Sequence, residues 1–502
     1  MKICFLLQRR FAYIGQEMAV LLKQKYEIND FCGYVFLRES YEYIKNQPSQ
    51  FSRLLLDENI HRQYKKERVD WEYIKKLEKE YGLPNLWPYI ELDRIIRSNQ
   101  LVRAYPHDSP SYSHEEMARI IQVTAKAIIK FLDKEKPDVV IFSAIGAIGS
   151  LLLYNIAKKK NIKTLVIHNS RVGIKYNLSD NYKNFSYVNG IFKKLQANEI
   201  SLPKHKAAAL ASLKKFQDNP KPNRSVDEPE FHPTNRKRHF SFLLPKKLSW
   251  SIYWRIKMIV RYILNPNRSD YSNINPFWEI WDNLKKKIRI LIGLNNLYDD
   301  VKMKEDFALF PLHLDPEITT LLYAPFYKDQ LWLVKQAAQS LPLNFKLYVK
   351  EHPAMAGCRK RYFYKELKKI PNVKLIRPGI NNLPLIDQAK LIITISGTTG
   401  WEAVQLKKPV IVFSDIFYSQ LPMVKKCTAI EDLPRLVKEQ LNNFKHDESA
   451  LVNFLTAIYK ESIDIDLTQL WQVEGAGQIK TKRDHLLPLV NLIAKKSNLK
   501  SI

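Results

Sequence analysis

Short apolar runs alternate with amphipathic helical patterns in two stretches of the chain, one toward each end. Runs of four to eight apolar and β-branched residues are typical of buried strands, whereas apolar residues that recur every three or four positions indicate helices. The expected helices span 16–25, 149–159, 330–340 and 400–406, and the expected strands span 2–7, 138–143, 163–168, 320–325 (TLLYAP), 346–351, 373–376, 391–396 and 409–414. Strand–helix alternation at this spacing predicts parallel sheets with helices on both faces.

The two alternating stretches predict two α/β domains joined by sequence of a different kind. We expect an N-terminal domain at 1–195, a basic linker and helical insertion at 196–299, a second domain at 300–475, and a C-terminal helix with a basic tail at 476–502. The 19 uncharged residues from 139 to 157 approach the length of a membrane span. Their β-branched start and internal glycines instead favour a buried strand, a turn and a buried helix over a membrane helix.

The segment between the predicted domains is basic, and its first part is rich in proline. Residues 201–290 hold 19 Lys and Arg against 7 Asp and Glu. The run 249–264 (SWSIYWRIKMIVRYIL) interleaves aromatic residues with cations on a predicted helix, a pattern that suits a membrane interface. Two other interpretations stay open: the helix packs its aromatic face on one of the domains, or it contacts nucleic acid.

Composition narrows the class of protein. The chain of 502 residues is 45% hydrophobic and carries a formal net charge of +29, so it can build large cores and should attract an anionic partner. Four widely separated cysteines argue against a disulfide framework or a zinc site, and the N-terminal apolar stretch is too short for a signal peptide. These features predict a cytoplasmic protein, either soluble or peripheral at the inner face of the cell membrane.

Lys350, Glu351, His352 and Pro353 follow directly on an expected strand. Proline lacks a backbone donor and ends the strand, and polar residues beyond the carboxyl end of a parallel strand face the crevice where α/β proteins bind ligands. The tetrapeptide therefore predicts a ligand contact. The alternative is that the His and Glu side chains only solvate the end of a strand.

A second candidate element joins the strand 391–396 to a helix through small and hydroxyl-bearing residues. Backbone N–H groups at a helix N-terminus, the helix dipole and nearby hydroxyls together favour a phosphate group. Glu402, one turn into this helix, could accept hydrogen bonds from ribose hydroxyls. The alternative is a helix capped by Thr398 or Thr399. The expected phosphate cradle consists of Ser396, Gly397, Thr398 and Thr399.

These motifs resemble those of bacterial capsule and surface-polysaccharide biosynthesis glycosyltransferases, including the HP-motif transferases of Kdo and sialic acid. The resemblance rests on PLHLDPE (311–317), VKEHP (349–353), SGTTGWEA (396–403) and, more loosely, PNLWPYIELDR (84–94). It implies the GT-B architecture, in which two Rossmann-type domains face a cleft, the second holding a nucleotide sugar and the first an acceptor. Similar family members often carry Gln-Pro-Glu where this chain has Asp315, Pro316 and Glu317, so position 315 departs from the family pattern.

The resemblance also implies roles for individual residues. His352 would contact the donor phosphate and take part in catalysis, with Glu351 as a further catalytic candidate; Lys350 would also bind the nucleotide; Glu402 would hold the ribose. The catalytic carboxylate and the acceptor contacts would come from the first domain. Candidates there are Asp93 with Arg94, Glu17 or Asp138. Apart from the resemblance, the position of Arg171 just after the strand 163–168 makes it a further candidate for the crevice. For Asp93 and Arg94, the start of a core helix with a surface ion pair explains the pattern equally well.

Other chemistries lack their usual sequence motifs. The chain has no GxGxxG, GxxxxGK[ST], GxSxG or HExxH motif, and its DxD pair at 464–466 is misplaced for a sugar-transferase metal site, so we expect no obligatory metal or cofactor. The sequence predicts a glycosyltransferase that takes a nucleotide sugar, with a CMP-linked acidic sugar as a narrower alternative, and a polysaccharide or lipid-linked acceptor. Two further alternatives are a nucleotide-sugar 2-epimerase of similar fold and a nucleic-acid-binding protein, although no nucleic-acid module is recognisable.

Overall fold

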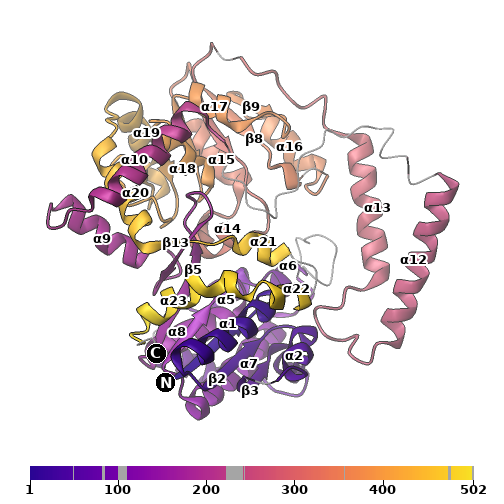
Figure 1. Ribbon diagram of the computed structural model, residues 1–502. Coiled ribbons are helices and arrows are strands. Elements are labelled where there is room, and N and C mark those ends of the chain that lie inside the picture. Colours follow the sequence, from indigo (N-terminus) through magenta and orange to yellow (C-terminus); the bar gives the residue numbers. More distant parts are fainter. Residues whose placement is uncertain are drawn as a thin grey trace. The chain divides into compact units, whose positions relative to one another are not determined.

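The chain forms two α/β units, each built around its own sheet (Figure 1). The computed structural model describes residues 1–48, 50–81, 85–99, 110–221, 241, 244–302, 304–355, 357–472 and 476–499. One unit comprises 1–97, 111–210 and 452–502, and the other 98–110 and 211–451. The predicted α/β class is thereby confirmed. Pro84 of the 84–94 motif and residues 222–240 of the insertion lie outside the described residues.

The first unit has a mainly parallel sheet in the order β13-β6-β5-β4-β1-β2-β3. The strands from β5 to β3 run parallel, and β6 and β13 extend the sheet in antiparallel pairings at one edge. The strands are β1 (Lys2–Leu7), β2 (Asp30–Val35), β3 (Phe51–Leu56), β4 (Val139–Phe142), β5 (Lys163–Asn169), β6 (Lys175–Ser179) and β13 (Ser462–Asp464). The helices are α1 (Phe11–Tyr26), α2 (Arg38–Lys45), α3 (Asp57–Arg62), α4 (Trp71–Glu80), α5 (Trp87–Leu92), α6 (Arg94–Ser98), α7 (His114–Glu135), α8 (Ile148–Lys159), α9 (Ser186–Gln196), α21 (Leu467–Gln472), α22 (Ala476–Thr481) and α23 (Leu487–Lys496).

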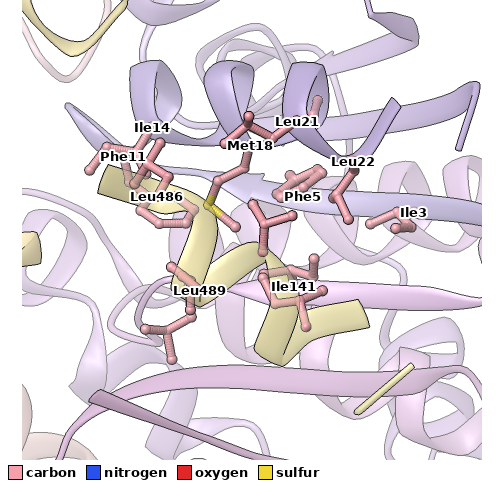
Figure 2. Close-up of a cluster of buried hydrophobic side chains, with 14 of the residues drawn as sticks. Ile3, Phe5, Phe11, Ile14, Met18, Leu21, Leu22, Ile141, Leu486 and Leu489 are labelled. Atoms are coloured by element: carbon pink, nitrogen blue, oxygen red, sulfur yellow. The ribbon is translucent and has the colours of Figure 1, made fainter. Parts of the chain in front are cut away.

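The C-terminal end of the chain completes the core of the first unit. In Figure 2, Leu486 and Leu489 lie among side chains of α1 and of strands β1 and β4. Alternate residues of β1 point into this cluster, as the two-residue period of a strand requires. The first unit also includes the chain from residue 452 onward, although we assigned 452–475 to the second domain from the sequence. The predicted strand–turn–helix at 139–157 is confirmed as β4 and α8.

The second unit has a parallel sheet in the order β12-β11-β10-β7-β8-β9. The strands are β7 (Phe307–Pro311), β8 (Lys346–Lys350), β9 (Val373–Ile376), β10 (Leu391–Thr394), β11 (Val410–Val412) and β12 (Val424–Lys426). The helices are α12 (Pro245–Leu264), α13 (Pro276–Ile292), α14 (Ile318–Tyr323), α15 (Gln330–Gln339), α16 (Arg361–Lys368), α17 (Asn382–Gln388), α18 (Thr398–Gln405) and α19 (Leu433–Asn442). Helices α10 (Pro203–Asp218) and α20 (Glu448–Glu461) have residues in both units.

The strand predicted at 320–325 is wrong. Residues Ile318–Tyr323 form the short helix α14, and the Thr320 hydroxyl donates to the backbone carbonyl of Glu317 at 3.0 Å. A short apolar run fits a strand and a buried helix equally well, so periodicity alone does not separate the two. The strand of this part of the sheet is β7, which pairs with β8 and β10 and was not predicted.

The predicted helix at 249–264 is present within α12, and a second long helix, α13, follows it. Figure 1 shows the two side by side, and they contact each other. Neither packs an aromatic face into a core: α12 has no buried residue. Among the described residues, no helix has both the length and the apolar character needed to cross a membrane.

Candidate functional site

Three neighbouring strands of the second unit end at the same edge of the sheet. Strand β7 lies between β10 and β8 and runs parallel to both, so the segments that follow the three strands meet at their carboxyl ends. These segments carry His313 after β7, Glu351 and His352 after β8, and Ser396 and Gly397 after β10. Both elements singled out from the sequence therefore belong to one site, at the edge where parallel α/β sheets bind ligands.

The buried carboxylate of Glu351 organises the segment after β8. One of its oxygens accepts from the backbone N–H of His352 at 2.7 Å, and the other accepts from the Tyr364 hydroxyl at 2.7 Å. The guanidinium Nε of Arg359 lies 3.1 Å from the same carboxylate as a close ion pair. Because both oxygens are engaged and the side chain is only 1% exposed, Glu351 positions its neighbours in this structure; its predicted catalytic role stays a prediction.

His352 is held in one ring orientation by the backbone. Its Nδ1 accepts from the N–H of Ala354 at 3.2 Å, which places the proton of the neutral ring on Nε2. Burial, with smaller effects from the cations Lys350 and Arg359, lowers the pKa of His352 to about 4. At neutral pH the ring is therefore uncharged and can donate a hydrogen bond through Nε2.

The turn from β10 into α18 is held by hydrogen bonds on both sides of Gly397. Its N–H donates to the Thr394 hydroxyl at 3.2 Å, and its carbonyl accepts from the Tyr418 hydroxyl at 2.7 Å. The Thr394 oxygen in turn lies 3.2 Å from Nε2 of His313. A side chain at Gly397 would come within 3.1 Å of the His313 ring, so glycine is needed for this close approach.

Helix α18 begins without the side-chain cap that the alternative interpretation requires. Gly397 occupies the N-cap position and makes no side-chain cap hydrogen bond. Of the predicted cradle hydroxyls, that of Ser396 donates instead to the carbonyl of Thr319 at 3.1 Å. Gly397 and Thr398 are partly exposed, whereas Thr399 is buried. The uncapped N-terminus thus keeps its partial positive charge and N–H donors at the end of the sheet.

A buried lysine adds positive charge to the same edge. Lys350 is 5% exposed, and burial lowers its pKa to about 8, while the negative charges of Glu351 and Glu402 act in the opposite direction. Its ammonium group donates to the carbonyl of Pro378 at 3.3 Å. Glu402 is 3% exposed and acts on Lys350 through its charge, so the ribose contact predicted for this carboxylate stays a prediction.

Several residues of the site were not singled out as functional from the sequence. His313 lies in the quoted PLHLDPE motif, but no role was assigned to it; its carbonyl accepts from Arg359 at 2.5 Å, and burial lowers its pKa to about 3. Arg359 also lies 3.4 Å from Asp315, the position that departs from the family pattern. Nothing in the local sequence marks Arg359, Tyr364 or Tyr418, because they reach the site through tertiary packing.

The candidates of the first unit have different surroundings. Both oxygens of the Asp93 carboxylate accept backbone N–H groups, from Ile95 and Ile96 at the start of α6 and, at 3.0 Å, from Ile148 at the start of α8. Burial raises the pKa of Asp93, against smaller effects from these hydrogen bonds and from Arg94. These contacts give Asp93 a structural task at two helix starts, and its catalytic role stays a prediction.

The other first-unit candidates also have structural partners. Arg171 has a left-handed backbone conformation, with φ 58°, and its N–H donates to the Asn169 side chain at 2.8 Å. Glu17 forms a close ion pair with Arg483, and Asp138 accepts from the backbone N–H of Lys2 at 2.6 Å. The described contacts therefore assign these residues no chemistry.

Part of the second unit is similar to a known protein family. Residues 267–435 match the family described as capsule polysaccharide biosynthesis protein. No curated protein matches the chain. Among solved structures, the β-Kdo 2,7-transferase of Thermosulfurimonas dismutans KpsC is 11% identical, with 72% of this chain and 89% of that chain covered and a TM-score of 0.36. The β-Kdo 2,4-transferase of the same protein is 16% identical, with 67% and 88% covered and a TM-score of 0.36.

UDP-GlcNAc 2-epimerase from Methanocaldococcus jannaschii, in complex with UDP-GlcNAc and UDP, is 16% identical, with 90% of this chain and 98% of that chain covered and a TM-score of 0.27. TM-scores this low do not distinguish between transferase and epimerase. The family match is more specific, because 267–435 contains both the VKEHP and the SGTTGWEA motifs as well as PLHLDPE. Over residues 267–435 the chain is thus similar to capsule polysaccharide biosynthesis proteins, which confirms the resemblance carried by its motifs.

Proposed function

We propose that the protein is a glycosyltransferase of capsule polysaccharide biosynthesis and that the edge formed by β10, β7 and β8 binds the phosphate of a nucleotide-sugar donor. The observation that carries this proposal is that the start of α18, which lacks a side-chain cap, lies at the same edge of the sheet as Lys350 and His352. A helix N-terminus, a buried ammonium group and a neutral imidazole donor together favour a multiply charged anion over a neutral ligand.

The same groups suit the chemistry of glycosyl transfer. When the bond between the sugar and the phosphate breaks, negative charge grows on the leaving phosphate. Donors fixed in advance around that charge lower the barrier, because no solvent has to reorganise. Lys350 and the α18 N–H groups would supply positive charge, and Nε2–H of His352 would donate a hydrogen bond. Arg359 and Glu351 would hold the His352 segment in place.

The donor and acceptor are narrower parts of this proposal. A CMP-linked acidic sugar is favoured by the resemblance of the motifs to transferases of Kdo and sialic acid. The acceptor would be a growing polysaccharide or a lipid-linked sugar at the cytoplasmic face of the membrane, bound by the first unit. Asp93, Arg94 and Arg171 remain the residues predicted for that side of the reaction.

Nucleotide binding tests the site directly. Thermal unfolding is followed with CMP, UDP or GDP in turn, for the wild type, His352→Ala and the matched control His485→Ala, whose ring is exposed and distant in sequence. A nucleotide at one hundred times its Kd should stabilise the wild type and the control by about 2.7 kcal/mol. The same nucleotide should stabilise His352→Ala much less. Equal stabilisation of all three proteins, or of none, would contradict the proposed contact between His352 and the donor phosphate.

The epimerase alternative is not favoured, because the family that residues 267–435 match is one of capsule polysaccharide biosynthesis. The two activities differ in their need for an acceptor. A transferase consumes the nucleotide sugar only when an acceptor is present, apart from slow hydrolysis, whereas an epimerase converts the sugar alone. Following the nucleotide sugar by NMR without acceptor therefore separates them. A rapid change of the sugar's configuration at C2 would establish the epimerase.

A further inference from the structure

Helices α12 and α13 expose an apolar surface that no part of the described chain covers. No residue of α12 is buried, and the side chains of Trp250 and Leu264 are 63% and 74% exposed. On α13, Phe277 and Ile292 are 60% and 64% exposed. Isolated apolar residues on a surface need no explanation, but a contiguous exposed patch on two adjacent helices marks a contact with another molecule or a membrane.

Five of the six exposed residues of α13, all but Trp278, follow one helical stripe. They are spaced by four, three, four and four positions, which keeps them on one face of the helix. This stripe consists of Phe277, Trp281, Leu284, Ile288 and Ile292. The opposite side of α13 faces the rest of the second unit: Ile290 lies against Gly357, and the Arg289 guanidinium donates to the carbonyl of Cys358. Since α13 is attached through that side, its apolar stripe stays available.

Aromatic rings and cations lie together on α12. The rings of Trp250, Tyr253 and Trp254 pack against one another with centroids 5.8 to 5.9 Å apart. The Lys257 ammonium group lies 4.9 Å from the Trp254 ring centroid. Tryptophan and tyrosine prefer the boundary between hydrocarbon and water, and lysine extends its charge from such a position toward the headgroups.

Charge decides which partner fits this surface. Residues 245–292 contain ten Lys and Arg against three Asp and Glu, and two of the three acids, Asp270 and Asp282, are buried. Glu279 is therefore the only acidic side chain on this hairpin that is not buried. A second copy of the chain would bring like charges together, which opposes association. An anionic lipid surface complements both the cations and the exposed aromatic rings.

We propose that the α12–α13 hairpin docks the protein on an anionic lipid bilayer, with its helices lying in the headgroup region. Helices of this kind bind by burying an apolar face while their cations contact the headgroups. The inference rests on the hairpin surface, independently of the nucleotide site. If the proposed function also holds, docking would bring the enzyme to a lipid-linked acceptor.

Vesicle co-sedimentation of the full chain tests the proposal. The vesicles contain phosphatidylcholine alone or mixed with an equal amount of phosphatidylglycerol. One variant, Trp250→Ser/Trp281→Ser, removes exposed rings, and another, Lys246→Glu/Lys247→Glu, reverses exposed charges. Their matched controls are Phe326→Ser/Leu343→Ser and Lys365→Glu/Lys438→Glu, which alter exposed residues of the same kinds outside the hairpin.

The wild type and both controls should bind the anionic vesicles and bind neutral ones far more weakly. Each cation near an anionic surface contributes about a fivefold gain in affinity, so Lys246→Glu/Lys247→Glu should weaken binding by at least about 25-fold. The ring variant should lose binding to both kinds of vesicle. High salt should weaken the binding of the wild type to anionic vesicles until it approaches that of Lys246→Glu/Lys247→Glu.

Three results would overturn the proposal. The first is a wild type that does not pellet with anionic vesicles, and the second is a pair of hairpin variants that bind as well as their controls. The third is a hairpin-dependent dimer, seen by light scattering, that binds no vesicles. Thermal stabilisation by nucleotide is measured on the same samples. Because the hairpin variants leave the phosphate site intact, a failed membrane test with normal nucleotide binding would refute the docking alone.

Discussion

One buried and one half-buried histidine at one sheet edge make the stability of the second unit depend on pH in a calculable way. Burial lowers the pKa of His313 to about 3 and that of His352 to about 4, from the ordinary value of 6.5. His313 lies 3.2 Å from the Thr394 hydroxyl, which already accepts from Gly397 and can therefore donate its own proton to the neutral ring. Protonation of His313 would remove this acceptor and charge a buried ring.

The sign of this pH dependence follows from whether the folded or the unfolded chain takes up protons at the higher pH. As pH falls below 6.5, the unfolded chain takes up protons on these histidines while the folded chain does not, so the folded state loses stability. At pH 5.5, one unit below the ordinary value and above both folded values, each histidine costs about 1.4 kcal/mol. The two together cost about 3 kcal/mol, a large part of the 5–15 kcal/mol that is typical of a domain. Above pH 7 this loss of stability should be almost absent, because the histidines are then neutral in both the folded and the unfolded chain.

Urea unfolding, followed by tryptophan fluorescence at pH 7.5 and pH 5.5, measures this loss. The comparison uses the wild type, His313→Gln/His352→Gln and the exposed control His485→Gln. Each substitution can change stability at both pH values, but only the double variant should reduce the difference between them, by about 3 kcal/mol. Carboxylates and His168 in the first unit contribute equally to all three proteins. A double variant with the full pH dependence of the wild type would refute the reasoning.

Two further predictions concern residues around the phosphate cradle. Because the pKa of Lys350 is lowered to about 8, its charge is present below that pH and lost above it, so nucleotide affinity should fall as pH rises from 7 to 9. In Lys350→Met, calorimetry should find affinity about tenfold weaker at pH 7 and independent of pH over that range. In Gly400→Ala, the new methyl group would collide with the Tyr418 hydroxyl, so stability should fall by about 1–3 kcal/mol. Gly190→Ala, where nothing lies within 4 Å, is the control and should not be destabilised when both are unfolded in urea.

The sheets could be predicted because their strands are continuous apolar runs bounded by polar or turn-forming residues. β8, β9 and β10 fall within one or two residues of their expected bounds. The prediction failed at 320–325, where β-branched and apolar residues form the helix α14. The strand β7 was missed although its first four residues, FALF, are an apolar run like those of the predicted strands.

The two segments at the centre of the site were predictable because each combines a strand end with polar residues. The parallel sheet then places them at one edge. The residues that orient them were not, because their partners are distant in sequence: Tyr364 lies 13 residues from Glu351, and Tyr418 lies 21 residues from Gly397. At Asp93 one sequence pattern fits two tasks. An acidic residue at a helix start beside aromatic residues has the pattern of a catalytic carboxylate, and its oxygens also accept from three backbone N–H groups, so its catalytic role stays a prediction beside this structural one.

The arrangement around His352 links the charge of a bound phosphate to the protonation of the site. Burial is the main cause of its low pKa, and the neighbouring cations Lys350 and Arg359 add to it. A phosphate group placed against α18 and Lys350 would offset the effect of those cations, and it would raise the pKa of His352 toward its ordinary value. Even at its ordinary pKa of 6.5 the ring would stay mostly neutral at pH 7, and its single proton stays on Nε2 because Nδ1 accepts from the Ala354 N–H, so the ring can still donate a hydrogen bond to the leaving phosphate. Glu351 keeps this geometry because its buried oxygens fix both the His352 backbone and Tyr364.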